Sequence, residues 1–465
     1  MKKEKLYNAI TNISDENIKR ADTYGQKVTK IKRKMWLSSV AAILVVAIVI
    51  GVVLWPGKDA IVLSANAIFE AEYPTLNSEY PGGGRIDSAI AQQLSPFFAE
   101  LIQKSLSDSG KENGVISPLS LYMAMSILAE STAGESQKQI LDLLKYDSLE
   151  QLRTGSNAIW NAVYNTHKSS TRLLANSVWL DDSVEFNNAT MKSIADNYYA
   201  SSFSGDMGSN QMSKVMKSWI NQNTNDILAN QVENIRLSPE TLYAIVSTVY
   251  YKCSWENKFK TDRTVFGTFH SAKGDVDAYF MKKSTMAAYY WGEGFSAISL
   301  ELQGGDKMWI ILPDEGTSPE EVLGSEQALS LMTSQKKTAS NKILMVHMTI
   351  PRFDVEENGD LSGVLKEMGV TQVFDMYNAD MSPVLKDGVL PNGDWLYATE
   401  VQHGVRVKVD ERGCEGAAYT IIPADPGTSE PPDDDEVDFI VDRPFIFAVT
   451  DRNSLPIFAG IVNNP

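Results

Sequence analysis

Residues 407–444 read VKVDERGCEGAAYTIIPADPGTSEPPDDDEVDFIVDRP, and this stretch decides how the rest of the chain is interpreted. It begins as a predicted strand, because the valines at 405, 407 and 409 alternate with polar or charged residues. Small residues follow at 413, 416, 417 and 418, and a run rich in proline and acidic residues precedes the apolar residues from Phe445 onward. A long segment of this kind inside a compact domain is usually functional or disordered. The sequence therefore predicts a strand that leads into a long, exposed loop.

The residues from 86 to 465 alternate between helical and strand patterns, with no visible internal repeat. Ser117 and Pro118 form a typical start for a buried helix over 119–129. Strands are predicted at 173–180, 242–251, 308–312, 343–350, 445–449 and 457–462. Because helices and strands are interspersed without a strict alternation, the pattern favours an α+β fold.

The N-terminal part has a different composition. Residues 1–34 carry ten Lys or Arg and four Asp or Glu, and residues 36–55 form an uncharged apolar run with a tryptophan at each end. A helix of this length spans a bilayer of about 30 Å, and the positive-inside rule places 1–34 in the cytoplasm. The alternative is a cleaved signal peptide, for which the apolar run is long. The sequence thus predicts a single-pass cell-membrane protein with a cytoplasmic tail (1–34), a transmembrane helix (36–55), a Pro- and Gly-rich linker (56–85) and an extracellular domain (86–465).

Charge and cysteine content limit the partners of this domain. The whole chain has a formal net charge of −17 although its tail is basic, so the body is strongly acidic and a nucleic-acid partner is not expected. Its two cysteines, Cys253 and Cys414, do not form a disulfide framework.

No motif for enzymatic chemistry is found. The four histidines do not form HExxH, and two cysteines are too few for a cysteine-rich zinc site. A lone S-x-x-K at 334–337 lacks the other motifs of the enzymes that use it. The acidic run 433–436 lacks the spaced ligands and glycine of a calcium loop and is interpreted as a solvated loop tip. We therefore predict that the chain is not an enzyme and holds no metal or cofactor.

Five segments in order along the chain resemble the serpin family. They are 113–136 (NGVISPLSLYMAMSILAESTAGES), 203–259 with Lys-Cys-Ser-Trp at 252–255, 403–413 (HGVRVKVDERG), 443–447 (RPFIF) and 456–460 (PIFAG). The resemblance covers about 90–465. It implies an α+β domain with three β-sheets, about nine helices and an exposed reactive loop.

The resemblance also implies a mechanism. Serpins are suicide inhibitors, in which a serine protease cleaves the loop and forms a covalent acyl-enzyme, and the cut loop then inserts into the central sheet as a new strand. The chain is accordingly expected to act as a monomer on a serine protease. A non-inhibitory, serpin-like surface binding protein is the alternative. Together with the apolar segment, the resemblance suggests a membrane-anchored, bacterial-type member.

Family register assigns two groups of site residues. The hinge of the loop comprises Glu411, Gly413, Cys414, Glu415, Gly416, Ala417 and Ala418. The residues at 414, 416, 418, 420, 422 and 424 face inward after insertion, and all of them are small or apolar. The lock that holds the sheet shut matches Ser117, Ser120, Ser247, His403 and Trp255, although Ser247 stands where the family has asparagine.

Counting seventeen residues from Glu411 places the reactive bond at Gly427-Thr428. The residues around it are small, which predicts a target of the elastase or subtilisin type. Cys253 and Cys414 allow two interpretations, a disulfide that fixes one state of the loop or two unrelated buried thiols.

Overall fold

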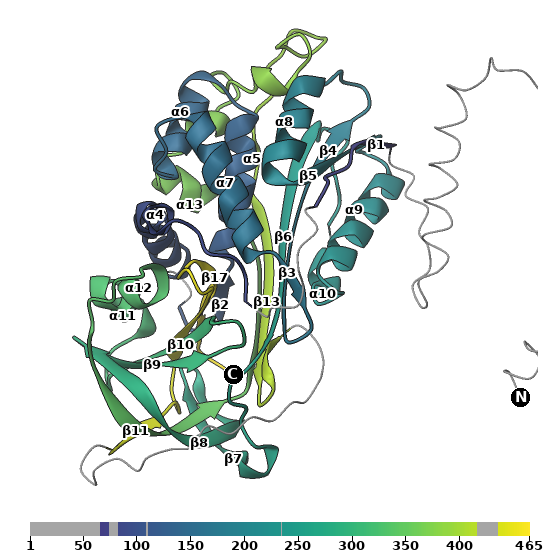
Figure 1. The fold of residues 1–465 in the computed structure, drawn as a ribbon. Helices are drawn as coiled ribbons and strands as arrows, with labels where there is room; N and C mark the ends of the chain where they lie inside the picture. The colour runs from purple at the N-terminus through teal and green to yellow at the C-terminus, as the bar shows by residue number, and fades with distance from the viewer. Residues whose placement is uncertain (1–65, 74–81, 108–109, 234, 416–435) are drawn as a thin grey trace, which may run out of the picture. The chain divides into compact units, whose positions relative to one another are not determined.

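The computed structural model describes residues 66–73, 82–107, 110–233, 235–415 and 436–465. All of these residues fall in one unit that extends from Ser64 to Pro465. The predicted tail and the apolar segment 36–55 lie outside the described residues. The unit has the α+β fold expected from the sequence, with two hydrogen-bonded sheets and helices packed on them (Figure 1).

The first sheet, called sheet A here, has the strand order β1-β5-β4-β6-β14-β13-β12, with β3 paired to β4. Strand β5 runs parallel to β4, and the other neighbours are antiparallel. The strands are β1 (Asn66–Phe69), β3 (Asn165–His167), β4 (Ser170–Asp181), β5 (Ala200–Gly205), β6 (Tyr243–Ser254), β12 (Phe353–Asp360), β13 (Gln402–Asp410) and β14 (Gly413–Glu415). Strand β1 comes from the segment predicted to be a linker and extends the edge of the sheet.

The second sheet, sheet B, has the order β15-β11-β8-β9-β10-β16-β17-β2, with β7 paired to β8. Its strands are β2 (Gly114–Ile116), β7 (Val265–Ser271), β8 (Gly274–Gly292), β9 (Phe295–Glu301), β10 (Lys307–Pro313), β11 (Ser340–Pro351), β15 (Glu436–Ile440), β16 (Phe445–Thr450) and β17 (Pro456–Val462). The structure thus corrects the expectation of three sheets. The 19-residue β8 pairs with β7 through its first half and with β9 through its last residues, so it joins two sheets into one.

The described residues contain ten α-helices, where about nine were expected. They are α4 (Ser88–Leu106), α5 (Pro118–Glu130), α6 (Gly134–Leu143), α7 (Leu149–Val163), α8 (Asn188–Tyr198), α9 (Asn210–Asn223), α10 (Ala229–Val232), α11 (Pro319–Leu323), α12 (Glu326–Thr333) and α13 (Ser362–Glu367). Helix α5 is apolar on nearly all sides, and every residue in it except Ala124 is buried. A helix of that kind must lie inside a core. Ser117 caps its start by accepting a hydrogen bond from the N–H of Ser120.

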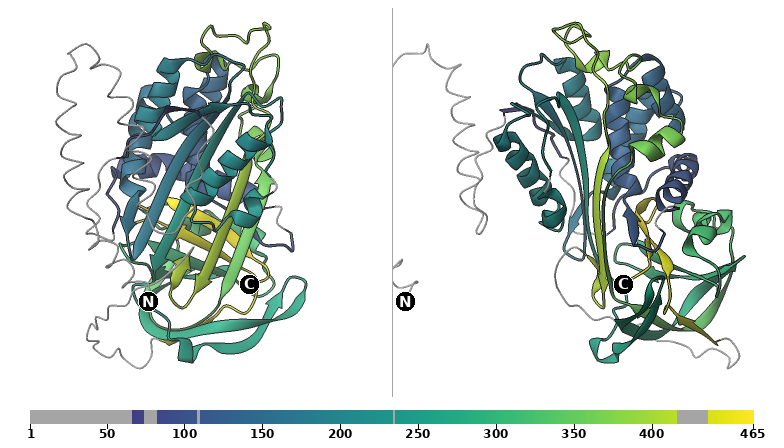
Figure 2. Two further views of the ribbon diagram at one scale, coloured as in Figure 1. Left: turned by 90° about the vertical axis from the view of Figure 1, so that its right-hand side faces the viewer. Right: turned by 180° about the vertical axis from the view of Figure 1, so that it is seen from behind.

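Sheet A is covered on both faces (Figures 1 and 2). On one face lie α5 and the main core, which also includes the apolar residues of sheet B. On the other face, α9 packs a smaller cluster around Trp179, Phe203 and Trp219. Residues of β6 alternate between these two cores, with Tyr251 and Cys253 in the main core and Val246 at the α9 side. A strand that enters beside β6 therefore meets a closed core through every second residue.

The membrane topology predicted from the sequence is corrected. Among the helices in the described part of the chain, none combines the length and the apolar character that a membrane crossing requires. The longest of them, α4, has 19 residues but exposes Gln92 and Gln103, because only one of its faces packs on the core. The single-pass, cell-membrane assignment with a cytoplasmic N-terminus and an extracellular body is therefore not supported by the described residues, which do not include 36–55.

Candidate functional site

Strand β14 fills one end of a strand position between β6 and β13. Its residue Cys414 lies opposite Cys253 of β6 and opposite Val409 of β13. The described part of β14 reaches Lys252 on β6 and Lys408 on β13. In the part of the chain that the structure describes, β6 and β13 have no backbone pairing with each other. The three residues of β14 thus link two strands that are otherwise unpaired with each other among the described residues. We call this part of sheet A the hinge end; it lies at the lower end of β13 in Figure 1.

Where β6 and β13 lack a shared ladder, the first turn of α5 connects them through side chains. The N–H of Ser117 donates to Nε2 of His403 on β13 at 3.0 Å, and Ser117 Oγ donates to the carbonyl of Ile457 at 2.8 Å. Ser120 Oγ donates to the carbonyl of Ser247 on β6 at 3.0 Å. The structure therefore brings together four of the five residues predicted for the lock, and we keep this name for Ser117, Ser120, Ser247 and His403.

His403 is a buried hydrogen-bond acceptor in this cluster. Only 8% of its surface is exposed, and burial lowers the pKa of its imidazole to about 4. The ring is neutral near pH 7, and Nε2 has a free lone pair to accept from the N–H of Ser117. Protonation would remove that acceptor and place a charge in the core.

Trp255 lies at the hinge end, apart from the other four predicted lock residues. Its indole Nε1 donates to the carbonyl of Asp410 at 2.8 Å, and its N–H donates to the carbonyl of Arg412 at 3.1 Å. These two bonds hold the turn that connects β13 to β14. Trp255 therefore positions the start of the hinge and makes no hydrogen bond to the lock.

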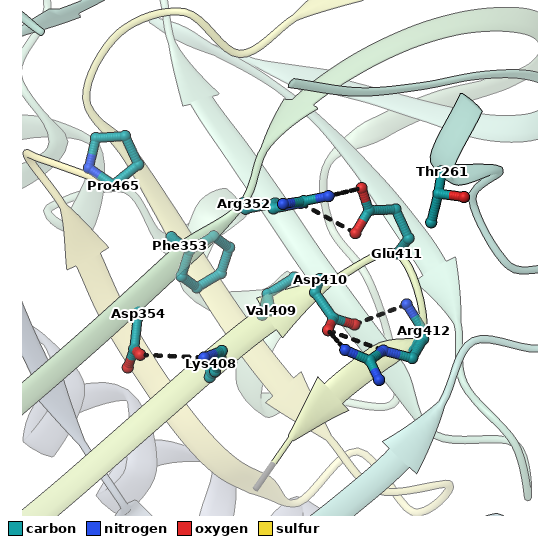
Figure 3. A pocket seen from close by; sticks show the side chains of 10 residues that line it. All are labelled: Thr261, Arg352, Phe353, Asp354, Lys408, Val409, Asp410, Glu411, Arg412 and Pro465. Atoms are coloured by element: carbon teal, nitrogen blue, oxygen red, sulfur yellow. Dashed lines mark hydrogen bonds and ion pairs between the residues drawn. The ribbon is translucent and has the colours of Figure 1, made fainter. Parts of the chain in front are cut away.

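Glu411 anchors the same turn through its carboxylate, and only 4% of this residue is exposed. Nη2 of Arg352 donates to it at 2.5 Å, Nε of Arg352 at 3.0 Å, and Oγ1 of Thr264 at 2.5 Å; the pair with Arg352 is visible in Figure 3. Burial alone would raise the pKa of Glu411, but the bonds from Arg352 and Thr264 outweigh it and hold the pKa below its usual value. The first predicted hinge residue is thus fixed as an ionised group.

Beside this turn lies a cavity of about 660 Å³, whose lining includes Lys408, Arg412 and Pro465. Its charged groups are paired with one another, as Figure 3 shows for Asp354 with Lys408 and for Asp410 with Arg412. In the described residues, no group of three or more His, Cys, Asp or Glu side chains is arranged to hold a metal ion.

Some predicted site residues lie outside the described residues, namely Gly416, Ala417 and Ala418 of the hinge and Gly427 and Thr428 of the reactive bond. Of the predicted hinge, the structure places Glu411, Gly413 and Cys414, and the backbone of Glu415. Gly413 allows the close approach of the strands, since a Cβ there would lie 2.1 Å from the carbonyl oxygen of Cys253.

Sequence reasoning missed the groups that support the hinge end from a distance. Arg352 and Thr264 are far from Glu411 in sequence, and neither belongs to a motif that would have indicated the contact. It also missed a fully buried ion pair, in which Nε of Arg172 donates to Asp306 at 2.7 Å. Tyr251 of β6 donates to the same carboxylate at 3.0 Å. A charged residue in a strand pattern gives no signal that it is buried until its partner is known.

Comparisons with known proteins agree on one family. The model of the family described as serpin (serine protease inhibitor) matches residues 92–465, more than half of the chain. The chain is similar to Serpin-ZX of Arabidopsis thaliana, with 28% identity over 399 residues that cover 81% of this chain and 98% of that protein. It is also similar to Serpin A3-5 of Bos taurus, with 26% identity over 399 residues that cover 82% and 90%, respectively.

Among solved structures, the fold is similar to that of the thermophilic serpin Tengpin in its native state. The TM-score is 0.73 at 24% identity, and the match covers 86% of this chain and all of the other. The plant and mammalian relatives do not support the membrane-anchored, bacterial-type member suggested by the sequence.

Proposed function

Because the chain belongs to the serpin family, we propose that it is a suicide inhibitor of a serine protease and that it traps the protease by inserting its cut loop into sheet A. The observation that carries this proposal is the strand position between β6 and β13, which β14 fills for only three residues. The family match supports a serine protease as the partner. The loop insertion and the protease class are proposed on the geometry and the sequence.

The register of β14 shows which residues would occupy the rest of that position. Gly413 pairs with Ser254, and Cys414 pairs with Cys253; if the ladder continues, Thr420 comes opposite Ser247. On the other side, Cys414 pairs with Val409, and the same continuation brings Thr420 opposite His403. The loop would therefore enter between the two strands that the lock connects, and the lock must part for insertion.

The same continuation ends where β6 begins. Ala424 comes opposite Tyr243, the first residue of β6. The inward positions 416, 418, 420, 422 and 424 follow the parity of Cys414, which is buried in the main core. All five are glycine, alanine, threonine or isoleucine. The run 416–424 thus fits a closed core without burying a charge.

Beyond this run, we propose that the target protease attacks the bond Gly427-Thr428. Its serine adds to the carbonyl carbon of residue 427, the amine of residue 428 leaves, and an acyl-enzyme remains on the loop. Because residues 413–415 already lie in the sheet, insertion of the twelve residues from 416 to 427 at about 3.3 Å each would carry the ester over roughly 40 Å. The small residues near the bond favour an elastase- or subtilisin-like protease, and the acidic run beyond it favours a basic one.

We further propose that residues 86–465 form the inhibitory domain and that it acts as a monomer. Residues 56–85 precede it, and their strand β1 extends sheet A. Residues 1–34 are basic in composition.

Incubation of the full-length chain with an elastase-like protease tests the proposal. The expected product is a complex that survives SDS and has the summed mass of protease and inhibitor. The variant Gly427→Arg should form such a complex with a trypsin-like protease, which the unchanged chain should not trap. If the unchanged chain and the Gly427→Arg variant are both cleaved in the loop and neither forms a complex, the non-inhibitory alternative is favoured instead.

A further inference from the structure

The two cysteines of the chain lie opposite each other across β6 and β14. Cys414 is the partner of Cys253 in the antiparallel register. Both are free thiols, with 1% of Cys253 and 2% of Cys414 exposed. Cys414 belongs to the hinge, which leads into the loop, whereas Cys253 belongs to a strand that also pairs with β4 from Tyr243 to Cys253. The only two cysteines in the sequence thus lie opposite each other, one in the hinge and one in a strand that is paired on both sides.

The backbone geometry of this pair suits a disulfide. Residues directly opposite in an antiparallel ladder have Cα atoms about 4.5 to 5.5 Å apart and side chains on the same face of the sheet. Disulfides have Cα separations of about 4.4 to 6.8 Å. The register of Cys253 and Cys414 thus places their Cα atoms in the range of separations that a disulfide spans.

The surroundings of the thiols limit when they can react. Sγ of Cys253 donates to the carbonyl of Gln303 at 3.2 Å, and burial raises the pKa of the Cys253 thiol to about 12. Burial, together with the neighbouring Cys253, also raises the pKa of the Cys414 thiol above its usual value. Because the thiolate is the reactive form, the pair is unreactive while β14 is in place. Exchange requires the hinge to leave the sheet briefly.

We propose that Cys253 and Cys414 form a redox lock, a reversible disulfide that fixes the hinge of the loop to β6. The oxidant is a small organic disulfide such as oxidised glutathione. One cysteine thiolate attacks this disulfide and releases one small thiol, and the second cysteine then attacks the mixed disulfide and releases the other. One sulfur–sulfur bond breaks and one forms, the two cysteines are oxidised, and their two protons end on the released thiols.

The bridge changes the balance between states of the loop. It excludes states in which the hinge is withdrawn, and it holds Cys414 in the register from which residues 416–424 would continue along β6. Insertion then starts from a strand end that is already formed, so the oxidised chain should insert its cut loop faster than the reduced chain. Reduction restores the withdrawn states and slows insertion.

Two measurements on the full-length chain test the redox lock without any protease. The chain is equilibrated with oxidised or reduced glutathione and digested for mass spectrometry under non-reducing conditions. We expect one linked peptide pair that contains Cys253 and Cys414 and has lost two hydrogen atoms. Hydrogen exchange of the amides of Cys414 and Glu415 should be at least about tenfold slower in the oxidised chain, because local opening is suppressed.

The variants Cys414→Ser and Cys253→Ser are matched controls, since each keeps a small side chain and removes one sulfur. Their exchange should be the same in both glutathione buffers, and circular dichroism checks their folding. The proposal is overturned if the cysteines stay unlinked or carry only glutathione adducts, or if the link forms without slowing exchange in β14. Neither measurement depends on whether the chain traps a protease. Failure of the redox lock is therefore distinguishable from failure of the proposed inhibitory function.

Discussion

The gap between β6 and β13 is held in different ways at two places. At the hinge end, the main chain of β14 lies between the strands and makes a ladder with each of them. Near the middle of β6, the strands are connected by side chains from the first turn of α5, through Ser120 to Ser247 and through Ser117 to His403. The first connection continues into the loop, whereas the second must break for the loop to enter.

This difference shows how one sheet can be stable and still accept a strand. A ladder places backbone groups in pairs that are costly to leave unsatisfied, so β14 marks where insertion begins. The lock consists of a few side-chain bonds that each contribute about 1 kcal/mol. The sheet is thus held shut weakly at the place where it must open, and the predictions below test this contrast from the largest expected effect to the smallest.

Thr420→Arg should have the largest effect. The continued register places residue 420 between Ser247 and His403, facing α5, so insertion would bury an unpaired charge at a cost of several kcal/mol. We expect the yield of SDS-stable complex to fall at least about 100-fold while loop cleavage continues. Tyr419→Arg is the matched control, because this position faces away from α5 and should leave trapping intact. Undiminished trapping by Thr420→Arg would contradict the insertion register.

Acidification should weaken the lock before it weakens the hinge end. The folded pKa of His403, about 4, is below the usual value, so the unfolded chain binds the extra proton first as pH falls. Stability is fully present above about pH 6.5 and is lost progressively toward pH 4, by up to about 3 kcal/mol. Urea unfolding across this range measures the loss. His403→Gln should flatten the curve between pH 6.5 and 4, and an unchanged slope would show that His403 does not cause it.

Glu411→Gln tests the hinge end. The change removes the charge that Arg352 pairs with, and since Arg352 remains 42% exposed and can be rehydrated, we expect a loss of about 1–2 kcal/mol. Hydrogen exchange in β14 should become faster, whereas exchange at Ser247 should not change. The folded pKa of Glu411 is lowered, so its contribution is present above the unfolded pKa and disappears only as pH falls through the folded value. Asp142→Asn, in an exposed pair with Lys138, should leave exchange in β14 unchanged.

Ser120→Ala should have the smallest effect on stability and a specific effect on the loop. It removes one bond between α5 and β6, worth about 1 kcal/mol, which corresponds to about a fivefold faster opening of the lock. Spontaneous loop insertion, followed by loss of inhibitory activity over time, measures this rate. Ser126→Ala on the same helix removes a buried hydroxyl whose partners include Tyr122 and Ser156 and makes no contact with β6 through it. Equal rates for the two variants would argue against a lock at Ser120.

Much of the fold could be predicted from the sequence. The apolar run after Ser117 predicts a buried helix, and α5 is one; the alternating valines of 405–409 predict a strand with one buried face, as in β13. The number of sheets could not be predicted, because the length of β8 that joins them depends on pairings with β7, β9 and β11. Local patterns specify which face of a strand is buried but not which strands share a neighbour.

The candidate site could likewise be predicted only in part. Family register identified Ser117, Ser120, Ser247 and His403, and they meet in space. It grouped Trp255 with them, whereas this residue supports the turn before β14. Arg352 could not be found from sequence, because a charged residue at the end of one strand has many equally plausible partners. Long-range side-chain contacts are determined by the packing of the whole domain.

The central claim is that sheet A has a strand position into which residues 416–424 insert after cleavage. The most direct test is to cut the loop of the full-length chain within 425–435 with a protease that it does not trap, and then to compare cut and intact chains by calorimetry and hydrogen exchange. The account predicts that the cut chain unfolds at a higher temperature and gains protection at the amides of β6 and β13. An unchanged or lower unfolding temperature, with these amides still exchanging as in the intact chain, would contradict it.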